Sequence, residues 1–210
     1  ISSPHYNPFQ SAYRSCHSTE TALLTLLNKT RLSADQGEST LLVSLDLSAA
    51  FDTIDHAILL DRLRLMYGVD GTALNWLRSY LTQRFQYVKV GQDISPSVLL
   101  STGVPQGSVL GPILFTSFIS PIQFVTSQFN VDQQQYADDT QVFISLSKGN
   151  SPDRVSRLKT ALVHLTSWFY HNGLALNPEK SEAILLGTHP RNKSLDNIAQ
   201  VDVNGSPIPI

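Results

Sequence analysis

Two adjacent aspartates, Asp138 and Asp139, are the residues whose types and spacing point most directly to chemistry. They lie between two strand-like runs, residues 133–137 and 140–146, so we expect them at the tip of a hairpin. Two like charges held this close repel each other unless a cation compensates them. A hard divalent cation such as Mg²⁺ prefers carboxylate oxygens as ligands. The pair is therefore a candidate metal site, and the alternative is an ordinary turn, in which aspartate is common.

A third carboxylate, Asp46, ends an apolar run that starts at Leu41. Such a run is typical of a strand buried on both faces, and we expect the strand over residues 39–47. An aspartate at its end would present a carboxylate at the edge of the sheet, where ligands commonly bind. Alternatively, Asp46 only caps the turn that follows. The nearby Asp52 and Asp55 are expected to be turn and helix-cap residues rather than ligands.

A glycine-rich loop from Gly103 to Gly111 is the third candidate. Glycines let another backbone approach closely, and successive backbone N–H groups can contact phosphate or a template strand. The alternative is an ordinary turn before a helix. A nucleophile elbow around Ser108 is excluded, because Leu110 occupies the place of the last glycine of that pattern.

Capping residues and apolar spacing predict the helices that position these groups. The first helix begins after Ser18 and ends near Ala34, and four leucines form its apolar stripe. Further helices are expected after Asp55, after Asp70, from Pro112 to Pro121, and from Ser151 to Gly173. The stripe consists of Leu23, Leu24, Leu27 and Leu32.

Strands are expected over residues 39–47, 84–90, 98–102, 133–137, 140–146 and 183–186. Helices and strands therefore interleave, with hairpins as well as crossovers. This pattern favours an α+β fold, with helices packed on one face of the sheet, over a doubly wound parallel fold.

Composition narrows the function classes. Hydrophobic residues make up 41% and charged residues 15% of the 210 residues, which excludes a disordered tail. The single cysteine, Cys16, excludes an internal disulfide and fits a reducing, intracellular compartment. No apolar run reaches the roughly 18 residues of a membrane span. The net charge of -2 disfavours a strongly basic nucleic-acid binder. Because Met66 is the only methionine, we expect the chain to be part of a longer protein.

Taken together and in this order, the three motifs strongly resemble those of reverse transcriptases of non-LTR retrotransposons. Residues 41–56 resemble that family's motif A, 103–115 its motif B, and 136–139 its motif C. Weaker similarities link residues 10–19 to a fingers motif and residues 173–180 to motif D.

The resemblance implies a polymerase palm with partial fingers and no thumb. Fingers elements would lie at about 1–40 and 57–102, and the palm at about 41–56 and 103–210. The implied activity is that of an RNA-directed DNA polymerase, with RNA template, DNA primer, deoxynucleoside triphosphates and missing flanking domains as partners. The alternatives are a domesticated, non-catalytic nucleic-acid-binding remnant and a metal-dependent phosphohydrolase, although the phosphohydrolase would need more His or Glu ligands.

The resemblance also implies a role for single residues in metal binding. Asp46 and Asp138 would bridge two Mg²⁺ ions, with Mn²⁺ as an alternative metal. Asp139 would be a second-tier ligand, and the carbonyl of Leu47 would complete one site. Lys180 would give a proton to pyrophosphate, and the alternative is a solvated lysine at the end of a loop.

On the nucleotide side, Phe51 would be a steric gate against a 2′-hydroxyl, or else a core aromatic residue. Gln106 would contact the incoming nucleotide, in a loop shaped by Pro105 and Gly107. Two further residues complete the implied substrate site. They are Ala137, whose small side chain would let the primer end sit close, and Arg14, which would reach the triphosphate or else be a surface arginine.

Overall fold

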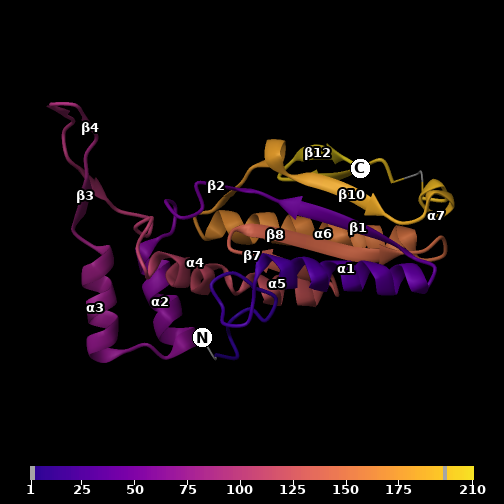
Figure 1. The fold of residues 1–210 in the computed structure, drawn as a ribbon, viewed down its shortest axis with the longest axis horizontal. Helices are drawn as coiled ribbons and strands as arrows, with labels where there is room; N and C mark the ends of the chain where they lie inside the picture. The colour runs from indigo at the N-terminus through magenta and orange to yellow at the C-terminus, as the bar shows by residue number, and fades with distance from the viewer. Residues whose placement is uncertain (1–2, 196–197) are drawn as a thin grey trace.

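The computed structural model describes residues 3–195 and 198–210 (Figure 1). Its centre is an antiparallel sheet with the strand order β10-β1-β8-β7. The strands are β1 (Ser39–Leu45), β7 (Asp132–Tyr136), β8 (Asp139–Leu146) and β10 (Glu182–Leu186). The predicted α+β fold with a palm-type antiparallel sheet is confirmed.

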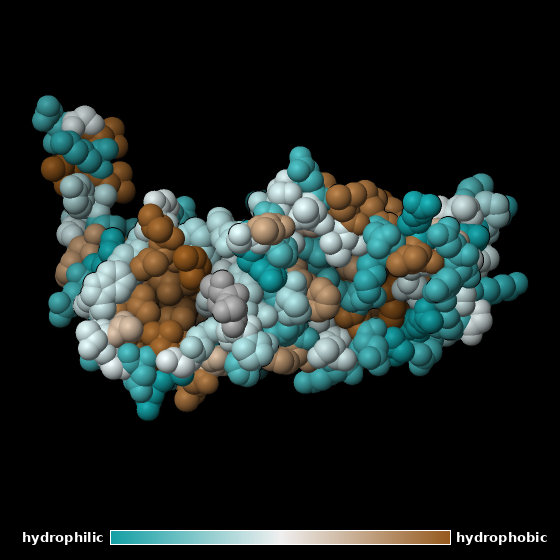
Figure 2. Space-filling view, turned by 60° about the horizontal axis from the view of Figure 1, so that its bottom comes forward, coloured by the Kyte–Doolittle hydropathy of each residue, from teal (hydrophilic) through white to brown (hydrophobic). Residues whose placement is uncertain are grey.

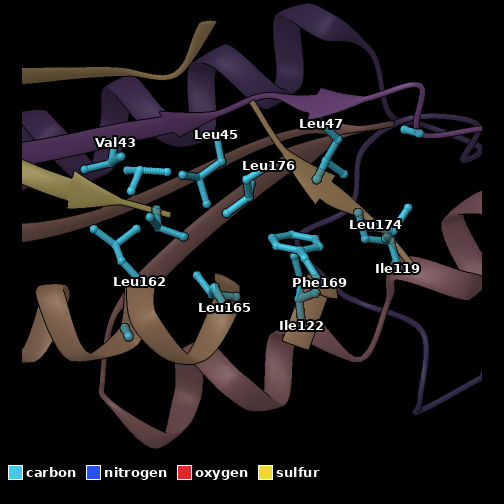
Figure 3. Packing of buried hydrophobic residues seen from close by; sticks show 14 of the residues in the cluster. Val43, Leu45, Leu47, Ile119, Ile122, Leu162, Leu165, Phe169, Leu174 and Leu176 are labelled. Carbon is cyan, nitrogen blue, oxygen red and sulfur yellow. The ribbon is translucent and has the colours of Figure 1, made fainter. Parts of the chain in front are cut away.

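One face of this sheet carries the main core. Leu41, Val43 and Leu45 of β1 are almost fully buried, as every second side chain of a strand points to the same face. Helix α6 (Ser151–His171) packs on this face together with α4 (Gly111–Ile119) and α5 (Ile122–Gln128). Figure 3 shows Leu162 and Phe169 of α6 facing the sheet side chains. The core thus fixes the strand that leads to Asp46.

The opposite face carries α1 (Thr19–Asp35). Ser18 caps this helix as predicted, in a reciprocal capping box with Thr21. Only Ala22, Leu26 and Ser33 are buried, and Leu26 packs against Leu42 and Phe143 in a small separate cluster. The prediction for the apolar stripe is therefore wrong, because this one contact turns the neighbouring leucines outward. The exposed residues are Leu23, Leu24, Leu27 and Leu32.

Two helices follow the Asp46 region. Helix α2 (His56–Tyr67) begins at the predicted cap Asp55, whose carboxylate accepts the Ile58 N–H, and α3 (Gly71–Leu81) begins at Asp70. Helix α2 ends at Gly68, which has a left-handed φ of 68°. The half-buried Arg62 of α2 donates to the Phe118 carbonyl and the Asn172 side chain, and desolvation lowers its pKa to about 10.

A narrow ribbon projects from the molecule beyond α3 (Figure 1). The two predicted strands form it as four short ones: β3 (Arg84–Gln86), β4 (Lys89–Val90), β5 (Asp93–Ile94) and β6 (Val98–Leu100). Its apolar side chains are largely exposed, Phe85 at 62% and Val90 at 72%. Figure 2 shows brown side chains gathered on this projection.

Several short elements escaped prediction, because they have neither clear caps nor periodicity. They are α5, β2 (Leu47–Ser48), β9 (Ala175–Leu176), the 3-10 turn η1 (Pro178–Lys180), α7 (His189–Lys193), β11 (Gln200–Val203) and β12 (Ser206–Pro209). In residues 3–195 and 198–210, no helix combines the length and apolar character needed to cross a membrane.

Candidate active site

Asp46 lies next to Asp139 across the sheet. Strands β1 and β8 pair up to Leu45 opposite Thr140, so continuing this antiparallel register by one residue places Asp46 opposite Asp139. Directly opposed side chains have their Cβ atoms roughly 4.5–5.5 Å apart. Both side chains belong to the face opposite the main core, because they alternate with the buried Leu45 and Thr140. Segments 93 positions apart in sequence thus bring two carboxylates to one edge.

Asp138 is at the tip of the β7–β8 hairpin. The strands pair up to Tyr136 opposite Asp139, which leaves Ala137 and Asp138 as a two-residue turn. The turn is therefore one residue earlier than predicted, since Asp139 already belongs to β8. Ala137 has a left-handed φ of 56°, which the first central residue of the tight type II′ hairpin turn requires.

The three carboxylates influence one another electrostatically. Burial raises the pKa of Asp139 above its ordinary value of 3.8, and the neighbouring charges of Asp138 and Asp46 raise it further. Repulsion of this kind favours a bound cation. The donor set consists of oxygens, which suits a hard divalent ion. In the described part of the chain, no three His, Cys, Asp or Glu side chains are already gathered closely enough to hold a metal. Mg²⁺ commonly binds through one or two carboxylates and completes its coordination with water and substrate phosphates. A site with fewer than three gathered protein ligands is therefore compatible with Mg²⁺.

The backbone after Asp46 is held by β9 and η1. The Asp46 carbonyl accepts the Asn177 N–H at 2.9 Å, and the Asp46 N–H donates to the Ser181 hydroxyl at 3.3 Å. Leu47 is paired with Leu176 in the same short ladder. With the Asp46–Asn177 bond beside it, Leu47 occupies a non-hydrogen-bonded position, so its carbonyl points away from β9. That carbonyl is free to accept a ligand from the other side.

Phe51, five positions after Asp46 in the sequence, packs half-buried against the main core. Its ring stacks on Phe115, with centroids 4.4 Å apart and an interplanar angle of 19°. Its carbonyl accepts the Val104 N–H at 2.9 Å, which joins the segment after Asp46 to the glycine-rich loop. The half-buried ring is thus held rigidly while one side remains accessible.

Gln106 makes a contact that the sequence did not predict. Its side-chain amide donates to both carboxylate oxygens of Asp52, at 3.0 and 3.2 Å. The Asp52 N–H bonds to the Ala49 carbonyl, so Asp52 is also the turn residue that was expected. The spacing of 54 residues between the two partners carries no local signal that could have found the pair.

Gly103 is required where the glycine-rich loop meets this turn. Its φ is 87°, and a Cβ added there would lie 2.8 Å from the Asp52 carbonyl oxygen. Gly107 also has a positive φ of 75°, but a Cβ there would meet nothing within 4 Å. Pro105 accepts the Ser108 hydroxyl and backbone N–H through its carbonyl, which shapes the same loop.

Two hollows flank these residues. A cleft of about 540 Å³ lies where the ribbon meets the loop, lined by Asp52, Arg84, Phe85, Thr102 and Gln106 among others. A smaller hollow of about 200 Å³ lies at the start of α1 and includes Tyr136 and Asp139. Asp139 and Gln106 therefore border separate hollows.

The remaining predicted site residues lie apart from the carboxylates' contacts. Arg14 donates to the carbonyls of Pro8 and Gln10 and lies over the Tyr6 ring, so it folds the N-terminal loop. Lys180 is exposed at the end of η1, a few residues beyond the Asn177 that holds Asp46.

Gln10 makes a contact at the hairpin tip that the sequence did not single out, except that it lies in the fingers motif. It is fully buried, and its side chain bonds to the backbone of Ala137 at the hairpin tip. Only the buried contact across 127 positions reveals it.

Known proteins of similar sequence and structure identify the family that has this arrangement. The family model described as "Reverse transcriptase (RNA-dependent DNA polymerase)" matches residues 1–202. The RNA-directed DNA polymerase from mobile element jockey of Drosophila melanogaster is 30% identical over 178 residues, which cover 82% of this chain and 19% of that protein. The Pol polyprotein of the type-1 retrotransposable element R2 of Popillia japonica is 26% identical over 163 residues, covering 73% of this chain and 25% of that protein.

A solved telomerase from Candida albicans, in complex with a fragment of telomeric RNA, has the same fold. Its TM-score is 0.63 at 15% identity, covering 95% of this chain and 33% of that one. The chain spans only about a fifth to a quarter of the length of the curated relatives named above, 19% and 25%. The resemblance to non-LTR retrotransposon polymerases is confirmed, and the chain belongs to the reverse transcriptase family.

Proposed function

We propose that this chain carries the polymerase site of a retrotransposon-encoded protein and adds deoxynucleotides to a primer 3′-hydroxyl on an RNA template. The single observation that carries the proposal is the strand register, which places Asp46 opposite Asp139, the residue that follows Asp138 at the hairpin tip. The family generally uses divalent metal ions. The raised pKa of Asp139, caused by burial and by the other two carboxylates, supports a site that is completed by cations.

In this proposal, Asp46 and Asp138 hold two Mg²⁺ ions, with Asp139 as a second-tier ligand and the Leu47 carbonyl as a further donor. Such a pair of ions, when bound, stabilises the attacking and leaving oxygens of an in-line displacement. The chain itself contributes rigid placement. Strand β1 ends at Leu45, directly before Asp46, the hairpin turn holds Asp138, and β9 orients the Leu47 carbonyl.

The nucleotide would lie against the loops beside these carboxylates. Phe51, fixed by its stacking on Phe115, would exclude a 2′-hydroxyl and so select deoxynucleotides. Gln106 lies in the loop that Pro105 and Gly107 shape. It would give up its hydrogen bond to Asp52 and contact the nucleotide instead. Ala137 would let the primer end approach. Two candidates gain no such support: the contacts of Arg14 favour a structural role, and Lys180 as proton donor rests on the resemblance alone.

The expected division into fingers and palm fits the arrangement of the elements. Helices α2 and α3 and the ribbon extend to one side of the sheet, as Figure 1 shows. The proposed fingers comprise about residues 1–40 and 57–102, and the proposed palm about 41–56 and 103–210. The arrangement supports the second fingers segment, whereas α1 of the first packs on the sheet. The RNA template, the DNA primer and the flanking domains of a longer protein are the proposed partners.

The substitution Asp138→Asn tests the proposal. It removes a charge that the site needs but leaves the turn intact, so primer extension on an RNA template should fall by about 10²–10³-fold or more. The matched control is Asp132→Asn, at the other end of the same hairpin, where the carboxylate bonds to the exposed Lys29. The control should extend primers as the wild type does, and both variants should keep the wild-type circular dichroism and melting temperature.

Unchanged nucleotide addition by Asp138→Asn would remove the enzyme hypothesis. A wild-type chain that binds primer–template but never extends it, with or without Mg²⁺ or Mn²⁺, would favour the non-catalytic remnant instead.

A further inference from the structure

The N-terminal loop extends the sheet at its free edge. Strand β7 is the last strand in the sheet order, and Gln10 forms a parallel bridge with Gln135 of that strand. The Gln135 N–H donates to the Phe9 carbonyl and the Ser11 N–H donates to the Gln135 carbonyl, each at 2.9 Å. Residues 9–11 therefore pair with β7, the edge strand of the hairpin that carries Asp138, as a very short additional strand would.

The side chain of Gln10 continues this pairing to the tip. Its amide nitrogen donates to the Ala137 carbonyl at 3.0 Å, and its amide oxygen accepts the Ala137 N–H at 2.9 Å. The same oxygen accepts the Ala12 N–H at 2.9 Å. Gln10 has no exposed surface, so these bonds do not compete with water. A side chain thus replaces the backbone partner that β7 lacks at the turn.

The turn needs such a partner because its backbone is unusual. Ala137 has a left-handed φ of 56°, a conformation that residues other than glycine rarely adopt. On the other side of the turn, the Thr140 hydroxyl donates to the Asp138 carbonyl at 3.3 Å and accepts from the Gln135 side chain at 3.0 Å. Rotating the peptide between Ala137 and Asp138 would break the bond from Gln10, and rotating the next peptide would break the bond from Thr140.

We propose that Gln10 is a positioning residue for Asp138. By holding both backbone groups of Ala137, it fixes the direction in which the next residue presents its carboxylate, toward Asp46 and Asp139. The inference rests on the proposed function, because it gives Gln10 a role in nucleotide addition. It also assigns the N-terminal loop a place in the site, although no residue of that loop need touch substrate or metal.

Other side chains fasten the same loop without reaching the tip, which separates positioning from anchoring. The Gln134 amide donates to the Phe9 carbonyl and to the Ser11 hydroxyl, and it is 4% exposed. It makes no hydrogen bond to Ala137. Gln134→Met therefore loosens the loop but leaves the hydrogen bonds between Gln10 and the Ala137 backbone intact. It is the matched control for Gln10→Met.

Hydrogen exchange in the wild-type chain is the first test and needs no variant. The Ala137 N–H belongs to a turn residue, and its acceptor is the buried Gln10 side chain. We expect this amide to be protected like those inside β7, measured residue by residue by NMR in the absence of divalent ions. Exchange at the rate of an open turn amide would overturn the proposal. In Gln134→Met the protection should persist, whereas in Gln10→Met it should be lost.

Steady-state primer extension is the second test. We expect kcat of Gln10→Met to fall by about 10–100-fold, as for residues that orient a ligand from behind. The KM for nucleotide and the affinity for primer–template should change little, because Gln10 touches neither. Gln134→Met should stay within about threefold of the wild type in kcat. Equal losses of kcat in the two variants would mean that Gln10 only fastens the N-terminal loop, and the proposal would be wrong.

A third variant covers the case in which Gln10→Met does not fold. Gln10→Glu keeps an oxygen for the N–H groups of Ala12 and Ala137. At a pH where the new carboxyl is ionised, its second oxygen replaces the donor and repels the Ala137 carbonyl. A folded Gln10→Glu with wild-type kcat would overturn the proposal. Failure of the proposed function looks different: the wild type would show no extension at all, while the protection of the Ala137 amide would be unaffected.

Discussion

Two antiparallel hairpins of this molecule are built in opposite ways. In β7–β8, Val142 is 0% and Phe143 4% exposed, with packing on both faces of the strand. In the ribbon β3–β6, Phe85 is 62% and Val90 72% exposed, and the described residues of the main core do not include them. One hairpin is held by its surroundings along its whole length, and the other only at its base.

The difference follows from what each hairpin has to present. A carboxylate that shares cations with two others must be placed closely, so its turn is supported by Gln10 and Thr140. A two-stranded ribbon without a packed face is marginally stable in water. Its shape is therefore set where it joins the body. There the Thr102 hydroxyl donates to the Asp52 carbonyl, and the Gly103 N–H donates to the Ile54 carbonyl. Placement comes from packing in the first hairpin and from the attachment in the second.

The largest expected effect compares a phenylalanine in each hairpin. Phe143→Ala should lower the free energy of unfolding by about 3–5 kcal/mol, because it removes a buried ring and leaves a cavity. It also removes the contact that holds Leu26 of α1. Phe85→Ala should cost about 0.5 kcal/mol or less, since the ring is mostly solvated. Urea unfolding followed by circular dichroism measures both values.

The comparison breaks if the two substitutions cost the same. A large cost for Phe85→Ala would mean that the ribbon is packed in solution, and a small cost for Phe143→Ala would mean that α1 is not held by the sheet.

A smaller effect is expected at the junction between the two regions. Gly103→Ala should destabilise the chain by about 2–3 kcal/mol, from its positive φ of 87° and from the overlap with the Asp52 carbonyl at 2.8 Å. Gly107→Ala has the conformational cost alone, about 1 kcal/mol, since its Cβ would meet nothing within 4 Å. Thermal unfolding of the two variants measures the difference. Equal melting temperatures would show that the close approach at Gly103 relaxes freely.

The sequence predicted the parts of this arrangement that have a local signal. The caps Ser18, Asp55 and Asp70 and the long helix α6 are where capping and periodicity place them. The hairpin that carries Asp138 was predicted to within one residue of its turn. Local preference and tertiary packing agree at these places, so pattern alone was sufficient.

The parts that were missed depend on contacts between distant residues. Gln10 and Ala137 are 127 positions apart, and Gln106 and Asp52 are 54 apart. A polar side chain gives no sequence sign of the backbone group it will bond. The prediction of the apolar stripe of α1 failed for a related reason. Leucines occur on several sides of this helix, and only tertiary packing decides which side faces the sheet.

The smallest expected effect concerns the cost of holding three carboxylates together. Burial and the charges of Asp138 and Asp46 raise the pKa of Asp139 in the folded chain above its ordinary value of 3.8. The folded state then binds a proton more tightly than the unfolded state. The contribution of Asp139 to stability is therefore present below pH 3.8 and is lost as the pH rises through the raised pKa.

Asp139→Asn should remove this loss, so without divalent ions it should be more stable than the wild type at neutral pH. The gain should shrink as the pH falls toward 3.8. It should be modest, because the side chain reaches solvent and the repulsion is screened. Urea unfolding at several pH values measures it. Adding Mg²⁺ should narrow the gap at neutral pH, because a cation bound to the wild type relieves the same repulsion. If the two proteins had equal stability at every pH, with and without Mg²⁺, the carboxylates would not interact. The hairpin supported by Gln10 and Thr140 would then hold Asp138 at a place where it shares no cation with Asp46 and Asp139.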